Sequence, residues 1–368
     1  MRSVRLVVAA LVLSSACKRV GPGITHVDAA HGAQLYGKLC ALCHGDQREG
    51  GKADNAPSLS SPTLLASASD DYLRNAIVRG RPGTAMAGYG KQIGGPLSDA
   101  DVSALMEFIR QGAPERAVMH APPPGNAAEG KNVYAQNCRV CHGEQGQRGT
   151  AVYLAGPSFL AAASDEFLAF AIDNGRPGTK MAAWRGTLTP NQISDLVSYI
   201  RSWSRPVEQP PKTEPKVPDN LPIVLNPTGP APAFPPLKED RYLPMADVKA
   251  AMDKGAKLVI VDARPPSDWL HVHIPGAISI PYYDMKMIDK LPNDGTWVLT
   301  YCACPHHASG IVLDELRKRG FKNSAVIDEG ILGWQRAGYP AVDVDGKPAP
   351  VPPGLPPATP IGPGPGAH

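Results

Sequence analysis

Cys40-Ala-Leu-Cys43-His44 is followed further along the chain by a second stretch of the same pattern, Cys138-Arg-Val-Cys141-His142. In C-x-x-C-H on a helical turn, two thiols can form thioethers with the two vinyl groups of a haem, and the adjacent imidazole reaches the iron from the same side. A thioredoxin-like redox pair would need a βαβ context, and a zinc site would need further ligands at short spacing, and neither is found around the motifs. The motifs therefore predict two covalently bound haem c groups, attached through Cys40, Cys43, Cys138 and Cys141 and ligated at the iron by His44 and His142.

A second repeated stretch follows each motif. Gly80-Arg-Pro-Gly-Thr84 recurs as Gly175-Arg-Pro-Gly-Thr179, and each is followed by a methionine, Met86 or Met181. Repeats in the same order predict duplicated domains. A lone methionine often fills a core, and Met106 fits that role because it lies on an apolar helical stripe. Met86 and Met181 lie in loops bounded by glycine and proline, so we predict that they are the second axial ligands of the two irons.

Each repeat closes with the pattern of an amphipathic helix. Ser98 with Asp101 forms a capping-box pattern ahead of apolar residues at i, i+3, i+4, i+7 spacing. Thr189 with Gln192 does the same in the second repeat, where Pro190 occupies the first helical position. Each repeat is therefore expected to be a helical domain.

Residues of about 30–112 and 126–204 resemble small class I bacterial cytochromes c, through C-x-x-C-H and the Gly-Arg-Pro-Gly-Thr-x-Met loop. The resemblance implies two all-α cytochrome c domains that transfer electrons, since histidine plus methionine ligation leaves no open position for a substrate. It also implies that Pro57 and Pro157 support the proximal imidazoles. Tyr36 and Tyr134 are expected to pack on the closing helices.

The sequence changes character after the second repeat. Residues 205–237 are rich in proline and are interpreted as an extended, semi-rigid spacer. Residues 238–345 then alternate helical stretches, at 245–253 and about 309–319, with apolar runs at 258–262 and 297–301, which predicts an α/β domain with a parallel sheet. Residues 346–368 are again rich in proline and glycine, and we expect this tail to be disordered.

Residues of about 242–344 resemble the rhodanese superfamily, through Val261-Asp-Ala-Arg264, Val272-His-Ile-Pro-Gly-Ala277 and Cys302 after an apolar strand. The resemblance implies that Cys302 accepts sulfane sulfur as a persulfide beside a helix N-terminus, where partial positive charge stabilises anionic sulfur. It also implies that Asp262, Arg264 and His273 are framework residues.

The loop after Cys302 departs from that family's pattern. His307 stands where arginine is common, Ala308 stands where serine or threonine is common, and Glu329 replaces a glycine. Since histidine lacks the guanidinium fork, we expect the loop to use anionic thiosulfate inefficiently. Cys304 either couples with Cys302 or is a small buried residue, and a Cys-x-Cys-Pro-His-His metal clip is a third interpretation. Whether the domain is an enzyme, with accessory roles for Cys304 and His307, or a non-catalytic binding module stays open.

The first sixteen residues have the features of an export signal. Arg2 and Arg5 precede an apolar run, Leu6–Leu13, that is too short to span a bilayer. Ser14-Ser-Ala-Cys17 then resembles the lipobox of bacterial lipoproteins, with ordinary secretion as the alternative. We expect a periplasmic or otherwise extracytoplasmic protein, anchored to a membrane by lipidated Cys17.

The charge distribution and the motifs together limit the kinds of partner that the protein is expected to bind. The net charge of +3 arises from 37 basic and 34 acidic side chains that are mixed along the chain, so no nucleic-acid surface is predicted. The expected partners are redox proteins, either an oxidase or a dehydrogenase, together with small sulfur compounds and the membrane.

Overall fold

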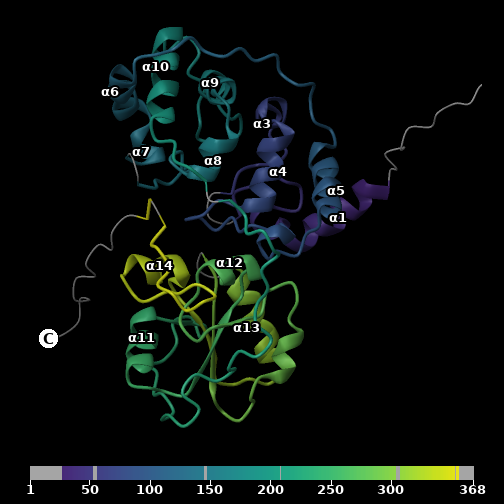
Figure 1. Ribbon diagram of the computed structural model, residues 1–368, viewed down its shortest axis with the longest axis vertical. Coiled ribbons are helices and arrows are strands. Elements are labelled where there is room, and N and C mark those ends of the chain that lie inside the picture. The colour runs from purple at the N-terminus through teal and green to yellow at the C-terminus, as the bar shows by residue number, and fades with distance from the viewer. Residues whose placement is uncertain are drawn as a thin grey trace, which may run out of the picture.

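The computed structural model describes residues 27–52, 56–144, 147–207, 209–303, 307–352 and 354–355. These residues form a helical lobe, which contains both C-x-x-C-H motifs, and an α/β lobe that follows it in the chain (Figure 1). The predicted fold class, helical domains followed by an α/β domain with a parallel sheet, is confirmed.

The helical lobe contains the same set of helices twice. In each copy a first helix leads into a short helical turn, two further helices follow, and a closing helix ends the unit. The first copy consists of α1 (Val27–Leu39), α2 (Ala41–His44), α3 (Pro62–Ser67), α4 (Asp70–Arg79), the 3-10 turn η1 (Lys91–Ile93) and α5 (Asp99–Arg110). The second consists of α6 (Ala127–Asn137), α7 (Arg139–His142), α8 (Pro157–Ala162), α9 (Asp165–Asn174) and α10 (Pro190–Arg201).

The closing helices α5 and α10 begin where their capping boxes predict. The Ser98 hydroxyl accepts a hydrogen bond from the Asp101 amide at 3.2 Å, and the Asp101 carboxylate accepts one from the Ser98 amide at 2.9 Å. Thr189 and Gln192 make the same reciprocal pair at the start of α10. These bonds satisfy amides that the first helical turn leaves without partners.

Each closing helix packs against the first helix of its copy. The ring centroid of Tyr36 lies 5.1 Å from that of Phe108, and the ring centroid of Tyr134 lies 5.5 Å from that of Tyr199, as expected for these two tyrosines. The helices cross closely at a glycine, since a Cβ atom on Gly32 would lie 2.1 Å from the carbonyl oxygen of Ala104. The equivalent Gly130 is crowded in the same way.

The two helical units share one continuous hydrophobic core. The ring of Tyr72, on α4, lies 4.6 Å from that of Phe167 and 6.1 Å from that of Phe159. The guanidinium of Arg81 lies over the Tyr72 ring, and the Ser158 hydroxyl donates a hydrogen bond to the carbonyl of Gly80. The units are therefore packed side by side as one lobe.

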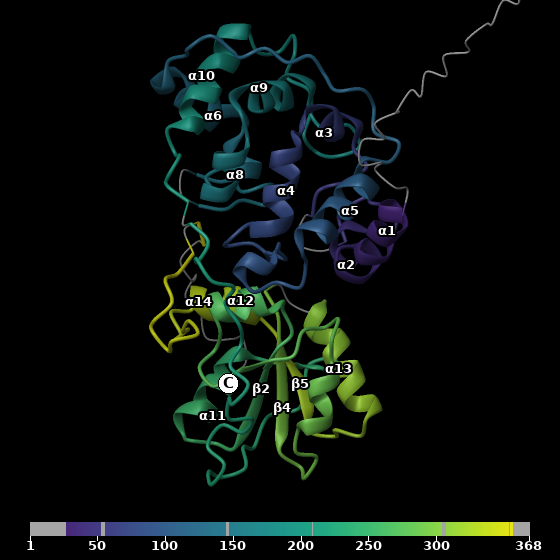
Figure 2. The same cartoon turned by 45° about the vertical axis from the view of Figure 1, so that its right-hand side comes forward.

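The α/β lobe is built on a five-stranded sheet in the order β1-β5-β4-β2-β3, and every strand pair is parallel. Figure 2 shows its longer strands β2, β4 and β5. Its strands are β1 (Tyr242–Leu243), β2 (Leu258–Asp262), β3 (Ile278–Ser279), β4 (Trp297–Tyr301) and β5 (Ser324–Ile327). Its helices are α11 (Met245–Asp253), α12 (Pro266–His271), the 3-10 helix η2 (Lys286–Lys290), α13 (Ala308–Lys318) and α14 (Gly330–Arg336).

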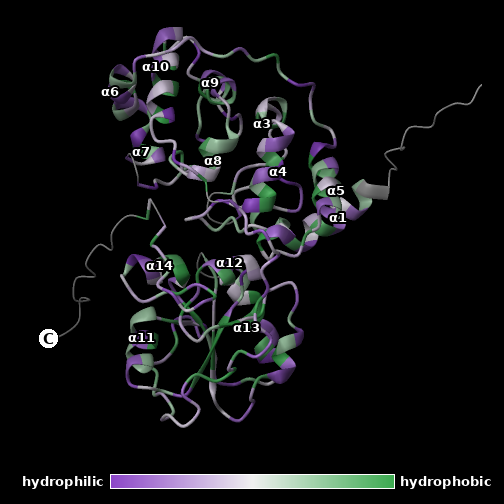
Figure 3. Ribbon diagram, viewed as in Figure 1, coloured by the Kyte–Doolittle hydropathy of each residue, from purple (hydrophilic) through white to green (hydrophobic). Residues whose placement is uncertain are grey.

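The sheet is buried on both faces. Leu258 and Ile260 of β2 face the core that contains α11 and α14, whereas Val259 and Val261 face the core that contains α13. A parallel strand that is covered on both faces is apolar at almost every position. This explains the uninterrupted run of apolar residues from which β2 is predicted. These strands are among the most hydrophobic parts of the chain (Figure 3).

Two sequence-based interpretations are corrected here. The spacer interpretation of 205–237 fails for its second half, because Leu225 pairs with Leu258 through backbone hydrogen bonds of 2.8 and 3.1 Å and Phe234 packs on Trp297. The predicted disorder of the tail fails for its described part, because the Ala349 amide donates a hydrogen bond of 2.9 Å to the Ala341 carbonyl and the Gly354 carbonyl accepts one of 2.7 Å from the Arg148 amide. In both segments a few residues gain enough contacts to offset the cost of ordering. Residues 356–368 lie outside the described chain.

Candidate functional site

Both C-x-x-C-H motifs form short helical turns that hold their histidines in one orientation. The His44 Nδ1 atom lies 2.9 Å from the carbonyl oxygen of Pro57, and the His142 Nδ1 atom lies 3.0 Å from that of Val152. Such a bond fixes the proton on Nδ1 and leaves the Nε2 lone pair for a metal. Burial lowers the pKa of both imidazoles, which favours the neutral form that a metal requires, although the carbonyl acceptors oppose this shift.

The expected support by proline is therefore right for Pro57 and wrong for Pro157. Pro157 is the first residue of α8, and the carbonyl of Val152, not that of Pro157, is the acceptor for the His142 Nδ1 atom. A proline at the first helical position is instead explained by its fixed φ angle.

Burial affects the first attachment cysteine of each motif. Burial, with a smaller contribution from the second cysteine of each motif, raises the pKa of Cys40 to about 12 and that of Cys138 to about 11. Within the described ranges no group of three or more His, Cys, Asp or Glu side chains is arranged to hold a metal ion.

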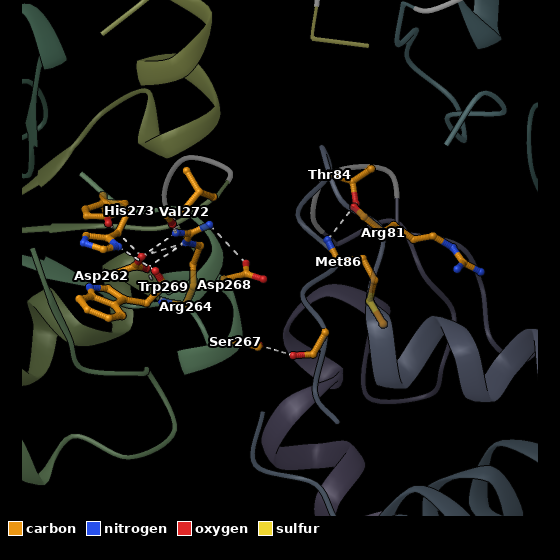
Figure 4. A network of polar contacts seen from close by, with 12 residues as sticks. Arg81, Thr84, Met86, Asp262, Arg264, Ser267, Asp268, Trp269, Val272 and His273 are labelled. Carbon is orange, nitrogen blue, oxygen red and sulfur yellow. Dashed lines mark hydrogen bonds and ion pairs between the residues drawn. The ribbon is translucent and has the colours of Figure 1, made fainter. Parts of the chain in front are cut away.

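The two methionine loops have the same closed geometry, and the first of them is drawn in Figure 4. The Thr84 hydroxyl donates to the Arg81 carbonyl at 2.7 Å and accepts from the Met86 amide at 3.0 Å, while the Arg81 amide donates to the Met86 carbonyl at 2.8 Å. The matching bonds in the second loop measure 2.7, 3.1 and 2.8 Å. Gly80 has a φ angle of 65°, and a Cβ atom there would lie 2.5 Å from the Met86 carbonyl oxygen. Each loop therefore fixes the backbone of its methionine.

The first methionine loop reaches back to its haem-attachment turn. The hydroxyl of Tyr89, three residues after Met86, donates a hydrogen bond of 3.2 Å to the carbonyl of Leu39, which directly precedes Cys40. The structure thus brings together the two segments that the sequence assigns to opposite faces of one haem. Met86 and Met181 are both half-buried.

The residues present fit a haem c group. Each copy offers two thiols, an imidazole with a free Nε2 atom, and a thioether on a constrained loop, which is the donor set of a histidine-methionine cytochrome. In addition, the buried Arg81 Nη2 atom has no hydrogen-bond partner among the described residues. A carboxylate of the haem edge is the kind of acceptor that such a donor lacks.

Cys302 lies at the carboxyl end of β4, beside the start of α13. Its side chain is buried, with 3% exposure, and its Sγ atom lies 3.3 Å from the Ser309 hydroxyl oxygen. Its carbonyl accepts a hydrogen bond from the Ile331 amide, and Gly330 is needed at this contact because a Cβ atom there would lie 2.4 Å from the same carbonyl oxygen. Cys304 lies outside the described residues, so its predicted pairing and the metal-clip interpretation stay predictions.

Asp262 and Arg264 tie the loops of the α/β lobe to the sheet (Figure 4). The Asp262 carboxylate accepts from Arg264 Nε at 2.9 Å and from Nη2 at 2.6 Å, and it also accepts from the Tyr301 hydroxyl at 2.9 Å. The same guanidinium donates to the carbonyl of Val272. His273 stacks on Trp269, with ring centroids 4.0 Å apart. These contacts are those of the framework that the sequence resemblance implies.

Glu329 has a role that sequence reasoning missed. It stands where the resemblance leads one to expect glycine, and its carboxylate accepts a hydrogen bond of 2.9 Å from the amide of Met245. Met245 begins α11 after Pro244, which provides no side-chain cap. The uncapped start of α11 could have indicated this role, since the first backbone amides of a helix need a hydrogen-bond acceptor from elsewhere when no capping side chain precedes them.

The α/β lobe contacts the first cytochrome copy through several polar bonds that the sequence did not indicate. The Tyr282 hydroxyl donates to the Leu39 carbonyl at 2.9 Å and lies 3.4 Å from the Tyr89 hydroxyl. The Ser267 hydroxyl donates to the carbonyl of Gly88 in the methionine loop. This fold and these sites define a class of protein that has two cytochrome c domains and a rhodanese-like domain docked on the first of them.

Comparisons with known proteins agree with this class. The family model described as cytochrome c oxidase, cbb3-type, subunit III matches residues 27–109 and 125–200, and the rhodanese-like domain model matches residues 245–337. The chain therefore combines cytochrome c electron-transfer domains, which imply haem c, with a rhodanese-like domain.

Relatives match one part of the chain or the other. The cbb3-type cytochrome c oxidase subunit FixP of Bradyrhizobium sp. (strain ORS 278) is 29% identical over 185 residues, covering 47% of this chain and 60% of that protein. The cbb3-type subunit CcoP of Azospirillum brasilense is 30% identical over 190 residues, covering 47% and 61%. The probable adenylyltransferase/sulfurtransferase MoeZ of Mycobacterium tuberculosis (strain ATCC 25618 / H37Rv) is 36% identical over 92 residues, covering 24% and 23%. The chain thus spans about 60% of the length of these cytochrome relatives.

A search of the described helices for membrane spans gave no segment with the length and apolarity to cross a bilayer.

Proposed function

We propose that this chain is an exported dihaem cytochrome that transfers electrons, and that its rhodanese-like domain carries sulfane sulfur on Cys302. The observation that carries the electron-transfer role is the duplicated arrangement of an imidazole held through Nδ1 and a methionine on a closed loop. The residues proposed to hold the haems are Cys40, Cys43, His44 and Met86 in the first copy, and Cys138, Cys141, His142 and Met181 in the second.

When bound, each haem supplies a one-electron redox centre whose ferrous state is favoured by histidine and methionine ligation. The chain orients the imidazoles through the Pro57 and Val152 carbonyls and holds the thioethers on hydrogen-bonded loops. Since a histidine and a methionine would both bind the iron, no position would be left for a substrate, and the sites are suited to electron transfer. Oxidase-type redox proteins are the proposed partners, since the FixP and CcoP relatives are described as oxidase subunits.

The number and attachment of the haems can be measured directly. The denatured holoprotein is expected to have a mass higher than that of the polypeptide by two haems, because four thiols stand at C-x-x-C-H spacing. Cys138→Ala with Cys141→Ala should remove one haem and leave the other. Haem that extracts into acidified organic solvent, or a mass increase of one haem in the wild type, would contradict the proposal.

The sulfur-carrying role rests on the position of Cys302 between the end of β4 and the start of α13. In the proposed step, the Cys302 thiolate attacks the outer sulfur of a persulfide donor, R–S–SH. The new S–S bond forms as that of the donor breaks, its electron pair leaves with RS⁻, and Cys302–S–SH remains. The partial positive charge of the α13 N-terminus favours the anionic sulfur before and after transfer.

Persulfide trapping followed by mass spectrometry tests this step. Wild type treated with a thiol-derived persulfide is expected to gain one sulfur at Cys302, and Cys302→Ser should lose at least about nine-tenths of the label, because the thiolate is the nucleophile. Cys304→Ser serves as the matched control, and its effect shows whether Cys304 resolves the persulfide. Label that persists in Cys302→Ser would exclude Cys302, and a wild type that no donor labels would favour a non-catalytic binding module.

We also propose that the mature protein is extracytoplasmic and anchored through lipidated Cys17, on the basis of the short apolar run and the Ser-Ser-Ala-Cys stretch. These residues lie outside the described chain. Cys17→Ser is expected to move the protein from the membrane fraction to the soluble fraction, since the acyl chains of a lipoprotein provide the attachment. Equal fractionation of the two forms would rule out anchoring through Cys17.

A further inference from the structure

The rhodanese-like domain covers one particular face of the first cytochrome domain. In the haem-attachment turn, Leu42 lies between the two motif cysteines and packs against the apolar core beside α13. In the methionine loop, Ala85 directly precedes Met86 and packs against the core on the other side of the sheet. Further along the same loop, the Gly88 carbonyl accepts a hydrogen bond from the Ser267 hydroxyl. One domain therefore contacts both segments that are proposed to hold the first haem.

The corresponding residues of the second cytochrome domain are exposed. By the order of the repeats Leu42 corresponds to Val140, and the side chain of Val140 is 83% exposed. Gly88 is buried, whereas its counterpart Ala183 and the neighbouring Ala182 are exposed. Helix α7, which contains Val140, lies at the outer edge of the helical lobe (Figure 1). Because the two matching segments of the first copy lie on one face, the exposed valine and alanines belong to one surface.

Charge also distinguishes the two faces. The covered face has Ala41 and Ala85, and the repeat has Arg139 and Lys180 at the same two positions. Both of these cations are exposed. A cation in the middle of an apolar contact would have to lose its hydration, whereas a cation on an open surface keeps it. The first copy is therefore suited to a permanent contact within the chain, and the second is suited to a charged partner.

Ion pairs border the exposed surface. Arg139 forms an exposed ion pair of 2.9 Å with Glu144. Arg185, just after the methionine loop, pairs with Asp173, but the arginine side chain is 70% exposed and that of the aspartate only 26%. Lys180 adds a third cation to these two pairs. An apolar centre with a polar rim is the usual composition of a protein–protein interface, and a cationic rim favours an acidic partner.

We propose that this surface docks an acidic electron-transfer protein. It is formed by Val140, Ala182 and Ala183, with Arg139 and Lys180 at its rim. The inference rests on the proposed electron-transfer role, and it assigns the exchange with external partners to the second haem site. Since Val140 directly precedes a haem-attachment cysteine, a partner on this surface contacts the attachment turn itself. Each encounter passes one electron between that haem and the metal of the partner, so one centre is oxidised as the other is reduced.

The duplication supplies the test substitutions. Arg139→Ala with Lys180→Ala gives the second copy the residues of the first, where alanine is compatible with both the attachment turn and the methionine loop. Lys254→Ala with Lys322→Ala is the matched control, because it removes the same charge from exposed positions of the rhodanese-like domain. Val140→Asp places a carboxylate in the apolar centre of the surface.

Binding is measured by titration calorimetry of the full-length holoprotein with cadmium-substituted plastocyanin, an acidic protein that in this form exchanges no electrons. We expect saturable binding at low ionic strength, with an affinity that falls as salt is added. The double alanine variant should bind about three- to tenfold more weakly, a range set by two exposed charged contacts. Val140→Asp should also weaken binding, and the control pair should bind like the wild type. No saturable binding, or equal losses in test and control variants, would overturn the proposal.

Hydrogen exchange in the same complex locates the contact. Protection is expected in α7 and in residues 180–185, and α2 should be unaffected because the rhodanese-like domain covers it. Protection of α2 by plastocyanin would overturn the assignment to the second cytochrome domain. Protection of α7 that increases with the concentration of the holoprotein alone would assign the surface to a second copy of this chain, and it would overturn the proposal as well.

Stopped-flow oxidation separates this inference from the proposed function. A ferrous holoprotein that ferricyanide does not oxidise would reject electron transfer itself, whereas oxidation by ferricyanide without plastocyanin binding would reject the docking surface alone. With copper plastocyanin as the oxidant, the double alanine variant should react at least about threefold more slowly at low ionic strength. The difference should disappear at high salt, because screening removes the contribution of the two cations. A difference that persists at high salt would overturn their proposed electrostatic role.

Discussion

Asp262→Ala is expected to lower the free energy of unfolding of the rhodanese-like lobe by about 3–5 kcal/mol, because it leaves a buried guanidinium without its partner. Asp262 is fully buried, and its carboxylate accepts hydrogen bonds from the guanidinium and the backbone amide of Arg264 and from the Tyr301 hydroxyl. The pKa of Arg264 is raised, since the charges of Asp262 and Asp268 outweigh the opposing effect of burial. Because the guanidinium of arginine is not deprotonated in proteins, Arg264 stays charged after the substitution and loses its main partner.

Hydrogen exchange is the suitable measurement, because it reports the α/β lobe separately from the cytochrome domains. Faster exchange is expected in β2 and β4, whose strands pair along their whole length. Asp268→Ala is the matched control, since Asp268 contacts the same guanidinium at 3.4 Å and should cost much less. Similar losses in both variants would show that Asp262 contributes no more than a peripheral ion pair.

The same residues illustrate which parts of the fold could be predicted from sequence. Helix α10 begins at Pro190, and the Thr189–Gln192 capping box that marks this start is a local pattern. The β2 run is recognisable because burial on both faces requires an apolar residue at each position. In contrast, β1 and β3 have two residues each, which is too short for any periodicity to indicate them.

The sites show the same division. The cysteines, histidines and methionines were predicted because they recur in a fixed order, and the structure gives both methionine loops the same hydrogen bonds. The hydrogen-bond acceptor for His142 was not predicted, since Val152 contributes only a backbone carbonyl, which any residue type would provide. The contact between Tyr282 and Leu39 joins residues far apart in the chain, and no local pattern records it. Long-range contacts of this kind become visible only in three dimensions.

Met86→Ala and Met181→Ala are each expected to abolish about half of the methionine-to-iron charge-transfer absorption of the ferric protein and to lower one of the two reduction potentials. The physical reason is that the thioether favours the ferrous state, so its loss stabilises the ferric form of that haem alone. Absorption spectroscopy and a potentiometric titration of the holoprotein measure both effects. Met106→Leu is the control, because Met106 is buried in the core on α5 and should leave both readouts unchanged.

The two substitutions also differ in what they predict for the rhodanese-like domain. The Met86 loop is bonded to that domain through Gly88 and Ser267, and no such bond is recorded among the described residues for the Met181 loop. Loss of the iron bond at Met86 should therefore change hydrogen exchange in α12, where Ser267 lies, whereas Met181→Ala should not. Spectra that do not change in either variant would mean that another residue ligates that iron. Equal effects of both variants on α12 would show that the contact at Gly88 does not couple the first haem site to the rhodanese-like domain.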